Sequence, residues 1–279
     1  MRKNRQSANS ASSSSAQPRK AANTRVEGKI HKRTGEEKLE FLVRLAFWER
    51  RSYAELSMDP LNPQLLMMGF IWYVVFLFST TCHEASHALA AKIGGDSTAA
   101  LGGQLSLNPL PHIQRSFYGM VLFPILSFAL SKGGGMIGWA SAPYDPLWER
   151  RHPRRSAWMA LAGPAANFSL MLLAVAALRG GMAFHLFHPD PVTGADSFAE
   201  TVLRVVFFLN LLLGTFNLLP VPPLDGSTGI MLLMSETQAQ KYLDWLRGSS
   251  YAMLGILVGM LVFSKVFPYI HDFARQLFF

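Results

Sequence analysis

The chain has a single cysteine, Cys82, and few charged residues. With one cysteine, the 279-residue sequence can form no intrachain disulfide and no zinc module built on several cysteines. Charged residues make up only 16% of the sequence, whereas half of it is hydrophobic and the mean hydropathy is +0.19. This composition argues against disorder over most of the length and indicates a membrane protein.

Most of the chain also lacks a net charge. The formal net charge is +8, but residues 1–51 hold 13 of the 26 lysines and arginines and 5 of the 18 acidic residues. The remaining residues therefore carry equal numbers of both signs. Because no basic groove is implied in the body of the protein, we expect no nucleic-acid partner.

The N-terminal region differs from the rest in composition. Its first part is rich in Ser, Asn and Ala, which is typical of a disordered tail. Leu39, Leu42 and Phe47 then recur at helical spacing among basic residues, which predicts a helix on a membrane surface or against the body. Such a long polar leader does not fit a signal peptide, although it could also serve only to solubilise the chain. We divide the sequence into a disordered basic tail (1–25), an amphipathic juxtamembrane segment (26–63) and a membrane-embedded domain (64–279).

Four uncharged runs are candidates for membrane-spanning helices. About 20 apolar residues are needed to cross a bilayer. Three runs have 18, 23 and 20 residues, and the fourth has 16 but can extend to residue 269. They predict an all-α, multi-pass membrane protein, and the absence of an internal repeat gives no support to an inverted-repeat transporter. The runs are Leu65–Cys82, Ser156–Leu178, Val205–Leu224 and Ser249–Ser264.

A fifth apolar stretch, Ser116–Ser131, is interrupted by Pro124 and followed by three consecutive glycines. This pattern suits a re-entrant segment that enters the membrane and returns. The glycine-rich sequences GGQLSL (102–107) and GGMIGWA (134–140) alternatively predict edge strands.

The motif His83-Glu84-Ala85-Ser86-His87 stands where the first run ends. On a helix, residues four apart share a face, so both imidazoles can reach one ion. The pattern is the H-E-x-x-H zinc signature, in which the glutamate acts as general base. A bare carboxylate after 18 uncharged residues would be costly in a bilayer, and a metal would compensate for that cost.

The third ligand is open from the residues alone, because hydrolytic zinc sites use three protein ligands. Asp225 ends the third uncharged run in the sequence NLLPVPPLDG, where three prolines must stop or unwind the helix. An Asp-Gly pair can equally be an ordinary surface turn. The other candidates are His112, His152, His185 and His188.

Taken together, HEASH, LAGPAAN (161–167) and FNLLPVPPLDG (216–226) resemble the motifs of the site-2 protease family of zinc intramembrane metalloproteases. The resemblance covers residues 67–235 in consistent order and is closest to the compact bacterial branch without PDZ or CBS domains. It implies one zinc ion bound by His83, His87 and Asp225. It further implies that Glu84 activates water and that Asn217 orients the reacting peptide.

The expected function is therefore a zinc-dependent endopeptidase that cuts membrane proteins in or near their transmembrane segments, in the cell (inner) membrane. The resemblance also favours a site that faces the cytoplasm, whereas the net positive charge of the N-terminal tail, expected on the other side of the membrane, favours the reverse orientation. The alternative is a catalytically silent membrane scaffold or chaperone of the same fold. A metal transporter is a third possibility, but it would need more ionisable residues along several spans.

The zinc hypothesis also constrains the topology. If His83 and Asp225 meet at one ion, the first and third spans must run in the same direction. An even number of crossings, most simply none, must then separate the first span from the second, so that Ser116–Ser131 is not a lone span. Between the spans, small residues around Pro164 allow close packing that would turn Asn167 toward the first helix, and Asn210 fits an interhelical hydrogen bond.

Overall fold

The computed structural model describes residues 63–131, 133, 135–189, 196–248 and 252–279, and every regular element in this part of the chain is a helix. The predicted tail (1–25) and nearly all of the juxtamembrane segment (26–63) lie outside the described residues. The all-α prediction is confirmed. The helices are α3 (Pro63–Gly94), α4 (Thr98–Leu101), α5 (Pro109–Arg115), α6 (Phe123–Leu130), α7 (Pro146–Arg151), α8 (Pro153–Ala183), α9 (Phe198–Asn217), α10 (Asp225–Gly229), α11 (Glu236–Gly248) and α12 (Ala252–Phe278), with a π-helix (Tyr118–Leu122) and a 3-10 helix (Ile230–Leu233).

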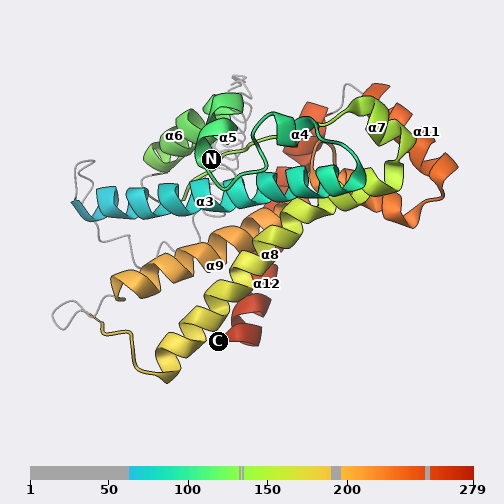
Figure 1. Cartoon of the computed structure of the whole chain (residues 1–279). Helices are drawn as coiled ribbons and strands as arrows, with labels where there is room; N and C mark the ends of the chain where they lie inside the picture. The colour runs from blue at the N-terminus through green and yellow to red at the C-terminus, as the bar shows by residue number, and fades with distance from the viewer. Residues whose placement is uncertain (1–62, 132, 134, 190–195, 249–251) are drawn as a thin grey trace, which may run out of the picture. The chain divides into compact units, whose positions relative to one another are not determined.

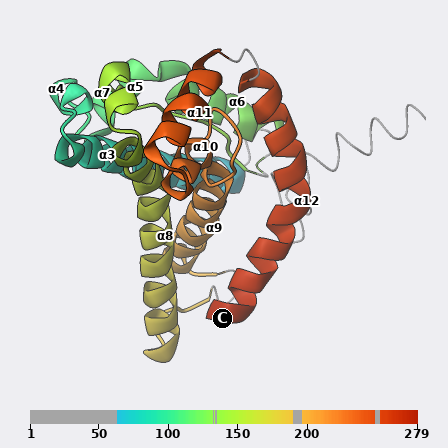
Figure 2. The ribbon, with the colours of Figure 1, turned by 90° about the vertical axis from the view of Figure 1, so that its right-hand side faces the viewer.

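Four of these helices are long and apolar enough to cross a membrane: α3, α8, α9 and most of α12. In Figure 1, α3 and α9 run from left to right, as predicted for the first and third spans, and α8 runs back in the opposite direction. Figure 2 shows α12 beside α9, against which it packs. Many large apolar side chains on these helices face outward, as lipid-facing residues do; Phe70 on α3, for example, is 67% exposed.

The helix ends follow local signals in the sequence. At the C-terminus of α3, Gly95 adopts φ +100°, the left-handed conformation that often ends a helix. At the N-terminus of α9, the hydroxyl of Ser197 accepts a hydrogen bond from the backbone N–H of Glu200. Since α9 begins at Phe198, the predicted start at Val205 was too late. An uncharged run does not mark the start of this helix, because Glu200 and Arg204 form an ion pair of 2.6 Å within it.

The described residues contain no strand, so the edge-strand alternative for 102–107 and 134–140 was wrong for every residue of these segments except 134, which lies outside the described residues. The segment after Gly135 has no regular secondary structure, and it lies against helical residues rather than another strand. The backbone N–H of Trp139 donates to the carbonyl of Gly119 in the π-helix, and the backbone N–H of Ile137 donates to the hydroxyl of Ser127. One helical carbonyl and one side-chain hydroxyl accept the hydrogen bonds that a neighbouring strand would otherwise accept.

The stretch between α3 and α8 begins and ends at the same end of the bundle. The backbone N–H of Asp145 donates to Asp96 just after α3, and the indole of Trp148 donates to the carbonyl of Gly94. The π-helix and α6 together cover only Tyr118–Leu130 and bend by 112° from α5. This arrangement agrees with an even number of crossings between α3 and α8, as predicted.

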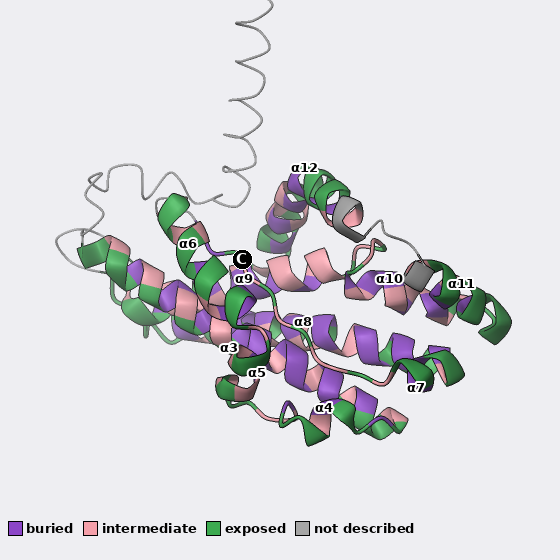
Figure 3. Ribbon diagram, turned by 90° about the horizontal axis from the view of Figure 1, so that it is seen from above, coloured by how far each residue is buried: buried purple, intermediate pink, exposed green. Residues whose placement is uncertain are grey.

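The buried residues of the bundle gather where α3, α8 and α9 pack together. Figure 3 shows the buried positions along α3 and α8, with exposed residues on α4, α7 and α11. Phe76 of α3 and Leu209 of α9 are each only 1% exposed and belong to one apolar cluster. A second cluster joins α8, α9 and α12. Between these helices, polar side chains are also buried, and they form the site described next.

Candidate metal centre

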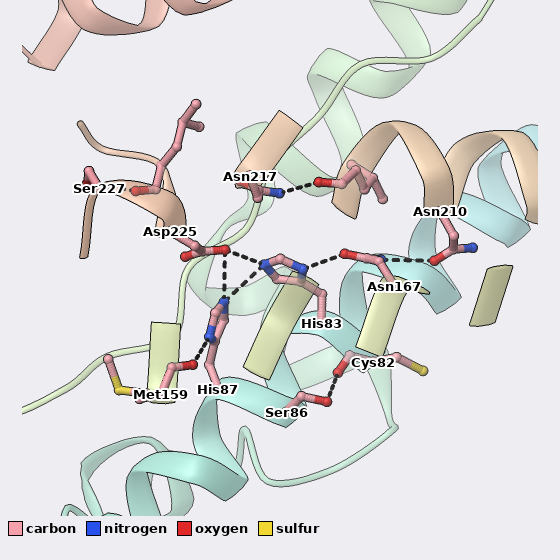
Figure 4. Close-up of polar contacts among 12 residues, drawn as sticks. Cys82, His83, Ser86, His87, Met159, Asn167, Asn210, Asn217, Asp225 and Ser227 are labelled. Carbon is pink, nitrogen blue, oxygen red and sulfur yellow. Dashed lines mark hydrogen bonds and ion pairs between the residues drawn. The ribbon is translucent and has the colours of Figure 1, made fainter. Parts of the chain in front are cut away.

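Two helical segments bring four of the predicted residues together. His83, Glu84 and His87 lie on α3, and their potential ligand atoms are all within 4.8 Å of one another. Asp225 begins α10, just beyond the proline-rich segment that ends α9. Figure 4 shows its carboxylate facing both imidazoles.

The distances between the potential ligand atoms match those around a tetrahedrally coordinated ion. His83 Nε2 lies 3.0 Å from His87 Nε2, and Asp225 Oδ2 lies 3.1 Å and 3.4 Å from these two nitrogens. Ligand atoms about 2.0–2.1 Å from a tetrahedral zinc ion are themselves about 3.3 Å apart. These three side chains therefore fit a zinc ion at their centre.

The other nitrogen of each imidazole is held by an oxygen atom. His87 Nδ1 lies 2.7 Å from the backbone carbonyl of Met159, and His83 Nδ1 lies 2.6 Å from Oδ1 of Asn167. Because these oxygens accept hydrogen bonds, both Nδ1 atoms carry the proton and both Nε2 atoms present a lone pair. Two lone pairs and a carboxylate oxygen then face one point, and such an arrangement is suited to a cation.

Two further features agree with a buried cation. Glu84 is 5% exposed, and its Oε2 atom has no hydrogen-bond partner among the described residues. Burial raises the pKa of Asp225, but the neighbouring imidazoles of His87 and His83 lower it well below its usual value. A deprotonated carboxylate is the form that binds metal.

Glycine at position 163 lets α8 approach this cluster. A Cβ atom there would lie 2.4 Å from His87 Nε2 and 2.6 Å from His83 Nε2, closer than real Cβ contacts allow. Gly226 has a similar role beside Asp225, because its Cβ would lie 2.2 Å from the carbonyl oxygen of Leu218. The turn after α9 can therefore fold back tightly and direct the carboxylate toward α3.

A model of peptidase family M50 matches residues 71–260 of this sequence, which is more than half of the chain and contains the whole cluster. The chain belongs to peptidase family M50, the site-2 protease family. The membership predicted from HEASH and NLLPVPPLDG is thereby confirmed.

Several curated proteins are similar in sequence to this chain. "Putative zinc metalloprotease YwhC" of Bacillus subtilis is 29% identical over 176 residues, which are 61% of this chain and 74% of that protein. "Putative zinc metalloprotease Rip2" of Mycobacterium tuberculosis is 33% identical over 188 residues, 66% of either chain. A Rip2 protein of Mycolicibacterium smegmatis is 30% identical over 177 residues, which span 61% of its length. No solved structure matches the chain significantly.

The spare histidines lie apart from the cluster. His112 donates from Nε2 to the carbonyl of Ser106 and is 1% exposed, which fits a structural role. His152 lies beside the ring of Trp148 at the start of α8, and His185 follows the opposite end of that helix. Among the described residues, neither these three nor His188 has a contact with the His83–His87 pair. Of the candidates for the third ligand, the structure brings only Asp225 to the pair.

Asn217 lies near the cluster in Figure 4 but does not contact it. Its side-chain N–H donates to the carbonyl of Leu213, one turn earlier on α9. The orienting role implied by the family therefore remains a prediction. The sequence predicts that Asn167 faces α3 and that Asn210 makes an interhelical hydrogen bond. It does not predict that Asn167 accepts a hydrogen bond from His83 and in turn donates one to Asn210. The signal was the presence of two amides within uncharged helices.

Proposed function

We propose that this protein is a zinc-dependent intramembrane endopeptidase that hydrolyses peptide bonds in or near transmembrane segments of membrane proteins. The observation that carries the proposal is the convergence of two imidazole lone pairs from the long apolar helix α3 with one carboxylate oxygen from the adjoining α10. Membership in a peptidase family and the names of the curated relatives support it.

His83, His87 and Asp225 would hold one zinc ion. A bound zinc ion would polarise the substrate carbonyl and lower the pKa of a water molecule toward neutrality. Glu84 lies beside the two histidines and has a free, buried carboxylate oxygen. It would take the proton from the attacking water and deliver it to the leaving amine.

Asn217 would orient the reacting peptide by donating a hydrogen bond to it. Its amide would first have to exchange its present bond to the carbonyl of Leu213 for one to the substrate. The substrate segment must itself be unwound, because a carbonyl within a helix is already hydrogen-bonded. The substrates proposed here are therefore membrane proteins whose transmembrane segment can open locally.

The proposed location is the cell (inner) membrane, with the site facing the cytoplasm. Four exposed or partly exposed arginines at the end of α7 and the start of α8 lie at the same end of the bundle as the cluster. Excess positive charge next to a span favours the cytoplasmic side. These residues are Arg150, Arg151, Arg154 and Arg155.

Substitution of Glu84 by glutamine tests the proposal. Glu84→Gln removes the proton acceptor but leaves the three ligands, so the purified protein should keep its zinc and lose cleavage of a single-span substrate by about 100-fold or more. Metal content and cleavage would be measured on the same samples. Asp225→Ala is the matched control, because it should lose zinc as well as activity.

Two results would contradict the proposal. Wild-type turnover in Glu84→Gln would show that this carboxylate is not the base. A zinc-loaded wild type that cleaves none of a panel of single-span proteins, while still capturing them, would favour the silent scaffold.

A further inference from the structure

The two histidines of the cluster are oriented by different kinds of partner. His87 donates to a backbone carbonyl, that of Met159, which no side-chain substitution can remove. His83 instead donates to the side chain of Asn167. An amide side chain can present either its oxygen or its nitrogen, so something must fix its orientation.

Asn210 supplies that orientation. Both N–H groups of its side chain are used, one toward the hydroxyl of Ser79 and the other toward the backbone carbonyl of Val206, each at 2.9 Å. Since a carbonyl can only accept, the nitrogen of Asn210 must face Val206 and its oxygen must face Asn167. The nitrogen of Asn167 donates to this oxygen at 2.9 Å, which leaves the oxygen of Asn167 for His83.

This chain of hydrogen bonds is fully enclosed. Ser79, Asn167 and Asn210 have no exposed surface, so water cannot replace a missing partner. The direction set at Val206 therefore reaches His83 across α9, α8 and α3, and Figure 4 shows the connected side chains. If the amide of Asn167 were reversed, its N–H would face Nδ1 of His83, and the proton of that imidazole would move to Nε2, where the ion must bind.

We propose that Asn210, acting through Asn167, is a positioning residue that holds His83 in the tautomer competent to bind zinc. The proposal rests on the metal centre of the proposed function, and it adds that the affinity for zinc depends on a residue one helix removed from the ligands. Partners of metal-binding histidines typically change metal affinity 10- to 100-fold when they are altered.

The test is a zinc competition titration of the purified full-length protein against a chromophoric chelator, without any cleavage assay. Asn210→Leu keeps the approximate volume but releases the amide of Asn167, so the affinity for zinc should fall about 10-fold or more. Adding Asn167→Asp should restore most of it. A carboxylate has no N–H to misdirect, so it accepts from His83 without help from position 210.

The matched control is Thr215→Val, which removes another polar group from α9. The hydroxyl of Thr215 bonds only to carbonyls of its own helix, so the affinity for zinc should stay within about twofold of wild type. Each variant would be checked for monodisperse elution, and Asn210→Ser would replace Asn210→Leu if the latter did not fold.

The outcomes separate this inference from the proposed function. A wild-type protein that binds no zinc would overturn both. Zinc bound equally well by wild type and by the Asn210 variant would overturn only the inference. A double variant no tighter than Asn210→Leu alone would also overturn it, because the amides would then act as general packing contacts rather than as a directional relay.

Discussion

The two halves of α8 lie in very different surroundings. Its first half carries Gly163 directly beside the two imidazoles and Asn167 in the buried hydrogen-bond chain. Its second half packs on aromatic rings of α9 and α12, and at Gly180 a Cβ would meet nothing within 4 Å. The first half requires directional, close contacts, whereas the second requires only apolar side chains that fill space.

This difference suggests that metal affinity and bundle stability are determined in separate places. A cavity of about 400 Å³ lies among α3, α6, α9 and α12, with Phe76, Phe216 and Phe267 in its wall. No residue of α8 lines this cavity, but packing is incomplete beside the aromatic cluster against which its second half lies. Around the histidines, by contrast, even one added methyl group would displace a proposed ligand. Substitutions in the two halves should consequently affect different measurements.

The largest effect is expected from Gly163→Ala compared with Gly180→Ala. Both changes raise the helix propensity of α8 by about 1 kcal/mol, so this contribution is the same in the pair. Only the methyl group at position 163 would push the imidazoles apart. Zinc affinity should fall by more than about 100-fold in Gly163→Ala, which exceeds the usual loss when a hydrogen-bond partner of a metal ligand is altered. In Gly180→Ala it should stay at the wild-type value. Equal zinc affinity in the two variants would show that α8 does not shape the site.

The same comparison explains what could be predicted from the sequence. His83 and His87 were identified because spacing on a single helix fixes their common face. Asp225 was left open by its spacing and was selected only through the family resemblance, since the turn that directs it depends on Gly226 packing against Leu218. The direction of the Asn167 and Asn210 amides could not be predicted, because it depends on the register between three helices.

The boundaries of the spans failed for an equally physical reason. Counting only uncharged residues places the start of the third span at Val205. Arg204 nevertheless lies within α9, where it is paired with Glu200 and Asp196. The last helix likewise continues to Phe278, beyond the predicted extension to residue 269. Paired or terminal charges do not end a helix, whereas the prolines after Asn217 do.

An intermediate effect is expected from Phe267→Ala, on the apolar side of the comparison. Phe267 is 2% exposed and packs against the rings of Phe208 and Phe263. Because lipid is as apolar as the protein interior, mainly van der Waals contacts are lost, and we expect a loss of about 2–3 kcal/mol in unfolding free energy. Zinc affinity should stay within about twofold of wild type. The exposed Phe273 on the same helix provides the control, Phe273→Ala. A large loss of zinc affinity in Phe267→Ala alone would mean that the apolar cluster packed on the second half of α8 affects the metal site beside its first half.

The smallest effect is expected from Asp96→Asn, at the end of α3 beyond the polar site. Asp96 is 4% exposed, and its carboxylate accepts hydrogen bonds from the backbone and hydroxyl of Thr98 and from the backbone of Asp145. Asparagine would turn an N–H toward one of these donors. We expect a loss of about 1–2 kcal/mol at neutral pH, with a smaller change in the exposed control Glu236→Gln.

The pH dependence of that loss gives the sharper measurement. Burial raises the pKa of Asp96, but the hydrogen bonds from Thr98 and Asp145 outweigh it, so the pKa in the folded protein lies below the ordinary value. The carboxylate therefore contributes its full stabilisation above the unfolded-state pKa of about 3.9 and loses it as the pH falls through the lower folded-state pKa. The difference in unfolding free energy between wild type and Asp96→Asn, measured on metal-free samples so that zinc release does not contribute, should be constant from pH 7 to about 4 and shrink below that. A difference that grew as the pH fell would mean that the protonated carboxyl, rather than the carboxylate, is the form that holds the end of α3 against α7.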